Sequence, residues 1–116
     1  MNKLDVPRDI SVPKVWDRTG LPSWSYHNSE LLEIEKENLF YNHWQLICHQ
    51  SDVSSVGEYI TFDICKERIL IIRDDKNVIR AFNNLCRHRG SRVVADNKGK
   101  CSAIVCPFHG WVYNFD

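Results

Sequence analysis

Hydrophobic and polar residues follow a short period over much of the second half of the chain. β-branched and aromatic residues, interrupted by polar ones, concentrate in four segments, residues 44–49, 59–64, 69–73 and 78–82. Polar stretches over residues 65–68 and 74–77 separate the last three segments and are typical of tight turns. Short strands joined in this way predict a mostly β fold, a small antiparallel β barrel or sandwich.

The beginning of the chain lacks this short period and predicts an extended arm followed by one short helix. Residues 1–28 contain three of the four prolines and show no sustained periodicity. This arm either packs on the domain or on a neighbouring subunit, or it forms a loosely ordered tail. Residues 29–40 combine acidic and apolar residues, and Ser29 is placed to cap a helix. We therefore expect an arm and helix over residues 1–42 and one domain over residues 43–116.

Beyond the fourth strand, the pattern predicts a β-hairpin between two polar loops. Residues 92–95 and 102–105 are suited to strands, and the Asp-Asn-Lys-Gly stretch over residues 96–99 is a turn signal. Residues 111–115 predict the start of a further strand. Such a hairpin would fix the distance between the loops that flank it.

Each flanking loop carries one cysteine and one histidine, the two residue types that most often bind transition metals through sulfur and nitrogen. The first loop contains Cys86-x-His88, the second contains Cys106-x-x-His109, and 17 residues lie between His88 and Cys106. Spacing this short lets both side chains of a pair converge on one centre, so two loops can hold one metal site.

Two metal centres accept two cysteines and two histidines. Zinc binds such a set tetrahedrally, but its usual fingers pair cysteine with cysteine and histidine with histidine along the chain. Here each loop mixes the two types, which favours a [2Fe-2S] cluster with the cysteines on one iron and the histidines on the other. Gly90 and Gly110, one in each loop, allow positive φ and a close approach of the backbone to a bulky group.

These loops resemble those of the Rieske domain of non-haem iron oxygenases, the large (alpha) subunits of ring-hydroxylating dioxygenases and related monooxygenases. The resemblance rests on Cys86-Arg87-His88-Arg89-Gly90 and Cys106-Pro107-Phe108-His109-Gly110-Trp111, and it extends back to about residue 21. It implies a mostly β Rieske [2Fe-2S] domain preceded by the arm and helix. The cluster ligands that it implies are Cys86, His88, Cys106 and His109.

The same resemblance implies an enzyme longer than this chain. In such oxygenases a mononuclear Fe(II) lies in a C-terminal domain, held by two histidines and a carboxylate. No such set is evident in this sequence, so we expect an amino-terminal part of a mono- or dioxygenase whose catalytic residues lie outside it. The resemblance implies a ferredoxin or flavin-containing reductase as electron donor and a homo-oligomer, a trimer. The alternatives are a free-standing Rieske-type ferredoxin and a zinc-stabilised binding module.

High-potential Rieske proteins of respiratory chains carry an extra cysteine in each loop and a serine after the second glycine. This chain has Ser91, Phe108 and Trp111 at those positions. Both departures favour the low end of the Rieske range of roughly −150 to +300 mV.

Composition and charge narrow the kinds of protein that the sequence can encode. The chain has 116 residues, 43% of them hydrophobic, and 15 basic residues balance 15 acidic ones. This suits one globular domain and gives no general attraction to nucleic acid. The N-terminus has no apolar run for a secretory signal or a membrane span, so we expect a cytoplasmic protein. Cys48, Cys65 and Cys101 are then expected as reduced thiols.

The other polar candidates are weaker. His27, His43 and His49 lie upstream of the loops and are expected in ordinary surface or core roles. Basic residues stud the first loop and the linker, at Arg87, Arg89, Arg92, Lys98 and Lys100. They form either a docking face for an acidic electron donor or a solvated face with a local pair to Asp96. Arg89 is the best candidate for a structural role.

Overall fold

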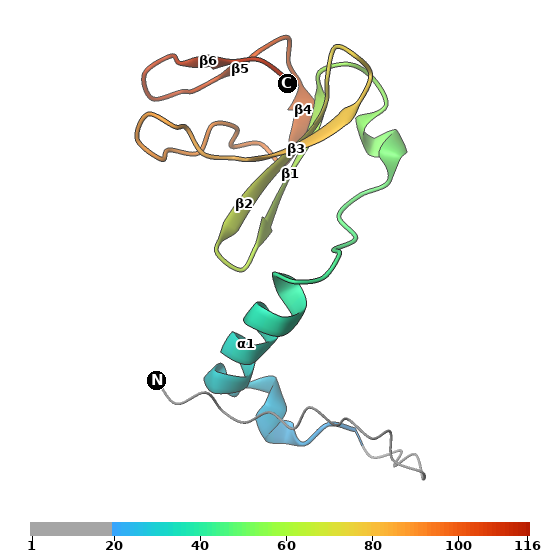
Figure 1. Cartoon of the computed structure of the whole chain (residues 1–116), viewed down its shortest axis with the longest axis vertical. Coiled ribbons are helices and arrows are strands. Elements are labelled where there is room, and N and C mark those ends of the chain that lie inside the picture. Colours follow the sequence, from blue (N-terminus) through green and yellow to red (C-terminus); the bar gives the residue numbers. More distant parts are fainter. Residues whose placement is uncertain (1–19) are drawn as a thin grey trace.

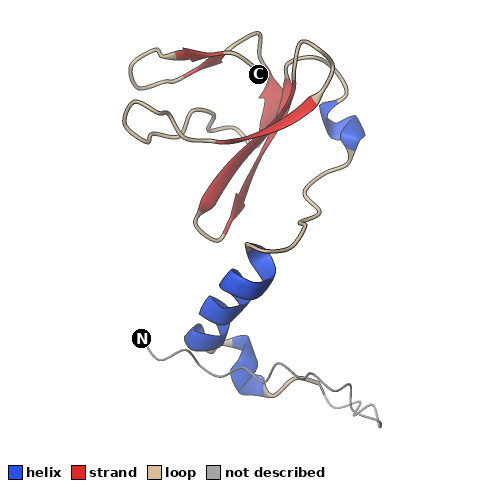
Figure 2. Cartoon of the chain, in the orientation of Figure 1, coloured by secondary structure: helices blue, strands red, loops and turns tan. Residues whose placement is uncertain are grey.

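The fold combines a four-stranded antiparallel sheet with a smaller two-stranded one (Figures 1 and 2). The computed structural model describes residues 20–116. The strands are β1 (Glu58–Ile64), β2 (Glu67–Arg73), β3 (Ile79–Asn83), β4 (Lys98–Lys100), β5 (Ile104–Val105) and β6 (Val112–Tyr113). The large sheet has the order β3-β2-β1-β4, and β5 pairs with β6. The predicted mostly β, sandwich-like class is confirmed, and within residues 20–116 the sheets do not close into a barrel.

Strand β2 lies between β1 and β3 because its side chains are the most apolar of the sheet. Its central residues Leu70, Ile71 and Ile72 are all buried, with at most 6% exposed. Tyr59 of β1 lies opposite Ile72, and Phe82 of β3 lies opposite Leu70. A strand that is paired on both sides and covered on both faces gives a continuous apolar run, as this segment does.

Several predicted strand boundaries shift by one or two residues. The β1–β2 turn contains only Cys65 and Lys66, so it is shorter than the predicted turn over residues 65–68. Cys65 has a φ of 55°, as a tight two-residue hairpin turn demands of one of its central residues. Strand β3 begins one residue later than predicted, at Ile79.

The strand predicted over residues 44–49 is wrong. This segment belongs to no sheet of the described part of the chain. Trp44 and Leu46 are almost fully exposed. A strand needs a neighbour as well as alternating side chains, and both sides of β1 are already taken by β2 and β4.

The hairpin predicted between the two loops is also wrong. Residues 92–95 form no strand, whereas β4 overlaps the second half of the predicted turn and pairs with β1, with Tyr59 opposite Gly99. Residues 104–105 become β5, which pairs with β6 instead. The linker therefore crosses from one sheet to the other rather than folding back on itself. The strand predicted over residues 111–115 is confirmed over Val112–Tyr113.

The predicted helix is confirmed, as α1 (Ser29–Glu35) continued by a π-helical turn, η2 (Lys36–Phe40). Its cap differs from the prediction, since Asn28 accepts the amide hydrogen bond of Leu31 at 2.8 Å. No residue of α1 or η2 is buried, and Figure 1 shows this helix extending away from the sheets. Residues 1–19 of the predicted arm lie outside the described residues. No helix in the described part is both long and apolar enough to cross a membrane.

One core joins both sheets to the candidate site. The buried residues in contact are Tyr59, Leu70, Ile72, Cys86, Val93, Ile104 and Cys106. Each fully buried aliphatic side chain of this kind contributes about 1.5–3 kcal/mol relative to an exposed one. The two predicted cysteine ligands are thus part of the apolar core itself.

Asp74, directly after β2, and Gly57, directly before β1, have closely packed surroundings at one end of the sheet. The carboxyl of Asp74 is fully buried and accepts hydrogen bonds from the Val78 amide (2.7 Å) and Arg80 Nε (2.9 Å). Burial alone would raise the pKa of Asp74, but these partners hold the pKa below its ordinary value. Gly57 has a φ of 81°, and a Cβ there would lie 2.1 Å from the carbonyl oxygen of Cys101.

Candidate metal centre

Loop 1, residues 86–91, is a closed turn held by its own backbone. The Gly90 amide donates to the carbonyl of Cys86 at 2.8 Å, and the Cys86 amide donates to the carbonyl of Ser91 at 2.7 Å. Gly90 has a φ of 68°, in the left-handed region that favours glycine. The sequence prediction that this glycine supplies a positive φ is confirmed.

Loop 2, residues 106–111, repeats the same turn at the tip of the β5–β6 hairpin. The Gly110 amide donates to the carbonyl of Cys106 at 2.9 Å, and the Cys106 amide donates to the carbonyl of Trp111 at 2.8 Å. Gly110 has a φ of 74°. The two loops differ in where the histidine falls, at the third residue of loop 1 and the fourth residue of loop 2.

The four predicted ligands come together as a buried pair and an exposed pair. Cys86 and Cys106 are 3% and 1% exposed, whereas His88 and His109 both lie on the surface. The Nδ1 atoms of the two imidazoles are 3.2 Å apart, and the rings meet edge to face. Sulfur ligands therefore lie on the core side and nitrogen ligands on the solvent side.

The cysteine sulfur of each loop is contacted by a hydroxyl group that comes from the other loop or from the strand next to it. Tyr113, on β6 just after loop 2, places its hydroxyl 3.0 Å from Cys86 Sγ. The same oxygen accepts a hydrogen bond from the Arg87 amide at 3.1 Å. Ser91 of loop 1 places its hydroxyl 3.3 Å from Cys106 Sγ. Since the Arg87 amide is the donor in its bond, the Tyr113 proton is free to point at the sulfur.

These hydroxyls change the protonation of the site. The hydrogen bond from Ser91, followed by that from the Phe108 amide, lowers the pKa of Cys106 to about 7. A larger share of this thiol is then thiolate, the form that binds metals. The hydrogen bond with Cys86 raises the pKa of Tyr113, so its hydroxyl retains its proton.

Aromatic rings cover the exposed imidazoles. Trp111 of loop 2 stacks on His88 of loop 1, with ring centroids 5.0 Å apart and planes 6° apart. Phe108 lies against His109 at 4.1 Å, and the Arg89 guanidinium lies 5.9 Å from the Phe108 ring. Phe108 and Trp111 remain 60% and 48% exposed. The outer end of the site is a semi-apolar surface with cationic groups around it.

Of the arginines near the loops, Arg92 forms an ion pair, whereas Arg87 and Arg89 lie at the exposed end of the site. Arg92 pairs with Asp63 of β1 at 2.5 Å rather than with Asp96, so the predicted local pair is wrong. Arg89 contacts the Phe108 ring, in line with a structural role, and Arg87 is exposed beside it. The docking face for an acidic donor stays a prediction.

The remaining histidine and cysteine candidates stay apart from the site. His49 caps a short 3-10 helix, η3 (Gln50–Val53), by accepting from the Ser51 amide, which is an ordinary structural role. All five cysteines are free thiols, and Cys101 packs against the core as expected. Among residues 20–116, no three His, Cys, Asp or Glu side chains converge as ligands of a single metal ion. A two-iron cluster of the Rieske type takes two protein ligands on each iron.

Two residues near the ligands, Tyr113 and Asn84, escaped the sequence analysis. Asn84 precedes loop 1 by two residues, is fully buried, and hydrogen-bonds through its side chain to residues 93 and 94, which follow that loop. The feature of the sequence that could have revealed Asn84 is an asparagine two residues before the first ligand cysteine, in a position that the strand pattern assigns to no element.

Comparison with known proteins agrees with this geometry. The family model described as the Rieske [2Fe-2S] domain matches residues 43–116. The glycine betaine monooxygenase oxygenase subunit of Chromohalobacter salexigens is 34% identical over 116 residues, which cover 97% of this chain and 26% of the relative. The quaternary ammonium Rieske monooxygenase CntA, solved with L-carnitine, superposes with a TM-score of 0.76 at 38% identity, over 82% of this chain and 27% of that one. Naphthalene 1,2-dioxygenase from Rhodococcus sp. gives a TM-score of 0.71 at 34% identity, over 74% and 20%.

The chain belongs to the Rieske [2Fe-2S] domain family. Its relatives include oxygenase subunits of monooxygenases and dioxygenases, so the resemblance noted from the loops is confirmed. The chain spans about a quarter of the length of the curated relatives that it matches, 26% for the first of them.

Proposed function

We propose that residues 43–116 bind a [2Fe-2S] cluster through two residues of each loop. Cys86 and Cys106 would hold the cluster on the core side, and His88 and His109, whose Nδ1 atoms face each other, would hold it on the solvent side. The observation that carries this proposal is the separation of the four side chains into a buried sulfur pair and an exposed nitrogen pair. Zinc in a Cys2His2 site would instead draw all four toward one point.

The donor set fits the cluster in distance and in charge. Two Nδ1 atoms 3.2 Å apart can both reach one metal ion at the usual metal–imidazole distance of about 2.1 Å. Each cysteine sulfur already meets a hydroxyl, from Tyr113 and Ser91, that stabilises a thiolate on the core side. Both histidines face outward, and neutral imidazoles add no charge to the buried end of the site.

The cluster supplies one-electron transfer, and the surrounding residues decide where electrons enter and leave. Because the imidazoles lie at the surface while the sulfurs are buried, the histidine end is the short path to a partner. Trp111 and Phe108 shield the faces of the imidazoles from water. Arg87 and Arg89 surround this end with positive charge, which favours an acidic electron donor.

For the whole protein we propose the large subunit of a Rieske-type mono- or dioxygenase. Its Rieske domain relays electrons from a ferredoxin or flavin-containing reductase to a mononuclear non-haem iron that hydroxylates or demethylates a small organic substrate. Support comes from relatives that are named as oxygenase subunits, including those of a glycine betaine monooxygenase and an anthranilate 1,2-dioxygenase. We further propose a cytoplasmic homo-oligomer, a trimer, in which residues 1–42 precede the Rieske domain as an arm and helix.

Metal and sulfide content test the ligand assignment directly. The chain is reconstituted anaerobically with iron and sulfide, and both are measured per chain in the unaltered protein and in C86S, C106S, H88A and H109A. We expect two iron and two sulfide in the unaltered protein, and the loss of most of both in each variant. The control C101S changes a thiol that packs against the core and whose hydrogen bond goes to the carbonyl of Gly57 rather than to either loop, and it should retain the full content.

A different outcome would separate the alternatives. Zinc at one per chain, bound in preference to iron and lost in all four variants, would assign a structural zinc site. Unchanged iron and sulfide in H88A together with H109A would remove the histidines from the ligand set and leave the Rieske assignment without its outer pair.

A further inference from the structure

The two ligand loops have the same internal turn but different supports. The stems of loop 2 are joined by a backbone ladder, in which Ile104 lies opposite Tyr113 and Val105 opposite Val112. Loop 1 has no such ladder between its stems. The strand before it, β3, pairs with β2, and residues 92–97 after it belong to no strand. Beyond the Cys86–Ser91 backbone hydrogen bond, something other than strand pairing must therefore hold the two flanking segments of loop 1 together.

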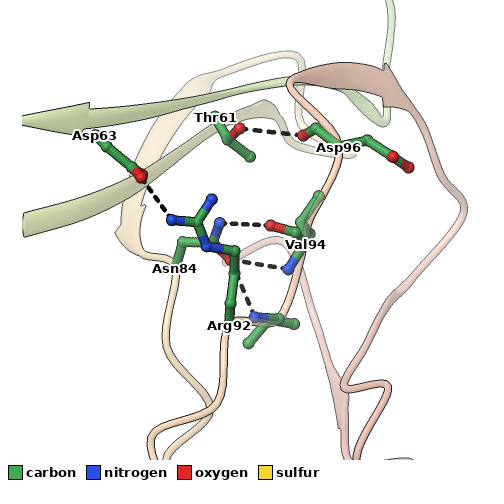
Figure 3. Close-up of polar contacts among 7 residues, drawn as sticks. Thr61, Asp63, Asn84, Arg92, Val94 and Asp96 are labelled. Atoms are coloured by element: carbon green, nitrogen blue, oxygen red, sulfur yellow. Dashed lines mark hydrogen bonds and ion pairs between the residues drawn. The ribbon is translucent and has the colours of Figure 1, made fainter.

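The side chain of Asn84 makes that connection (Figure 3). Its Nδ2 donates to the carbonyl of Val94 at 2.7 Å, while its Oδ1 accepts from the amides of Val94 at 2.9 Å and Val93 at 3.2 Å. The carboxamide thus takes the place of a neighbouring strand, offering one donor and one acceptor to the backbone. Asn84 is 0% exposed, so water does not compete for these bonds.

Asn84 is itself tied to the sheet, and so is the segment that it grips. Its backbone amide donates to the carbonyl of Arg68 on β2 at 2.7 Å. On the other side, Arg92 pairs with Asp63 of β1, and Thr61 Oγ1 donates to the carbonyl of Asp96 at 3.1 Å (Figure 3). Those outer contacts are exposed and individually weak. Outside the loop's own backbone turn, the buried carboxamide is the contact that joins the two segments flanking loop 1.

We propose that Asn84 is the positioning residue of loop 1, which sets where Cys86 and His88 stand relative to their counterparts in loop 2. This proposal rests on the proposed cluster site but concerns a residue whose side-chain hydrogen bonds go to the backbone of residues 93 and 94 and not to the ligands. Few side chains can replace it, because the site requires a donor and an acceptor on one short planar group. Alanine removes all three bonds, and serine can make at most part of them.

Amide hydrogen exchange of the metal-free 116-residue chain tests the proposal without reference to any cluster. The amides of Cys86 and Gly90 report on loop 1, and those of Cys106 and Gly110 report on loop 2, since each makes a hydrogen bond within its loop. In N84A we expect at least a tenfold loss of protection in loop 1 and less than a twofold change in loop 2. The control N83A alters the exposed neighbouring residue and should change neither loop.

A second experiment uses the reconstituted protein and distinguishes a role of Asn84 in positioning loop 1 from a role in overall stability. Val53 is fully buried in η3, away from both loops, so V53A lowers stability without touching loop 1. Variants N84A and N84S are compared with V53A under conditions that give equal fractions unfolded. We expect iron release to a chelator about tenfold faster in N84A than in V53A, with N84S between them. The spectrum of the reduced cluster should shift in the Asn84 variants and remain unchanged in V53A.

The outcomes distinguish this proposal from the proposed function. If the unaltered chain binds no cluster, the proposed function fails, and the exchange experiment still decides the role of Asn84 in loop 1. Equal loss of protection in both loops, or equal iron release from N84A and V53A, would overturn the positioning role. Failure of both N84A and N84S to fold while N83A and V53A fold would assign Asn84 to the fold as a whole and overturn it as well.

Discussion

The hydroxyl of Tyr113 is the contact through which the protein acts most directly on the proposed cluster. Replacement by phenylalanine removes one oxygen and keeps the ring, which packs against the core at the base of β6. Two hydrogen bonds are lost, the 3.0 Å contact to Cys86 Sγ and the 3.1 Å bond from the Arg87 amide. A donor to the sulfur stabilises negative charge there, and reduction adds negative charge. Y113F should therefore lower the reduction potential.

The size of the effect follows from the hydrogen bond to sulfur. A hydrogen bond to a charged group contributes about 1.5–3 kcal/mol, and only the part that is stronger in the reduced state affects the potential. Taking that part as about 1 kcal/mol gives a decrease of about 40 mV, since a tenfold change, about 1.4 kcal/mol, corresponds to 59 mV for one electron. The contact from Ser91 to Cys106 is longer, at 3.3 Å, so S91A should lower the potential by about half as much.

A spectroscopic redox titration of the reconstituted protein at pH 7 measures the shift. Y41F is the matched control, because it removes the same atom from a half-exposed tyrosine that lies outside the two loops and the core. Its potential should equal that of the unaltered protein. A potential in Y113F that is unchanged or higher, with cluster content intact, would refute the role assigned to the hydroxyl.

Three further predictions concern stability, measured by urea unfolding. The depressed pKa of Asp74 contributes stability that is present above its unfolded pKa of about 3.9 and is lost as pH falls through the lower folded value. D74N should therefore be less stable than the unaltered protein at pH 7 and should lose less stability than that protein between pH 5 and 2. Equal dependence of stability on pH in the two proteins would contradict this. G57A, which forces a Cβ into a carbonyl at positive φ, should cost about 3 kcal/mol or more, whereas G20A, with open space around it, should cost less than about 0.5 kcal/mol. R92A, which breaks an exposed ion pair, should cost less than about 1 kcal/mol, and a larger loss would contradict the weak contribution assigned to this pair.

The ligand loops could be predicted because their information is local. Two ligands within three or four residues and a glycine for the positive φ are visible in sequence, and the structure shows Gly90 and Gly110 in that conformation. The central hairpin was equally accessible, because the apolar run of β2 and the polar turn before it both lie within a few residues. Errors there amounted to one or two residues at the boundaries.

The features that the sequence did not predict depend on contacts between segments that are distant along the chain. The alternation over residues 44–49 predicts extended backbone but cannot supply a partner strand. Residues 92–95 have the composition of a strand, yet their backbone groups are partly satisfied by one side chain, that of Asn84. Tyr113 lies 27 residues from Cys86, and no spacing rule predicts that its hydroxyl meets that sulfur. Pairings of this kind appear only once the two loops are placed against each other.

The central claim is that two imidazoles and two thiolates hold a two-iron cluster from opposite ends. Electron–nuclear double resonance on the reduced protein, prepared with ¹⁵N-labelled histidine, measures it most directly. Two strongly coupled histidine nitrogens on a cluster with a rhombic signal are the expected result, reduced to one in H88A or H109A if cluster remains. A cluster signal without any histidine nitrogen coupling would contradict the account.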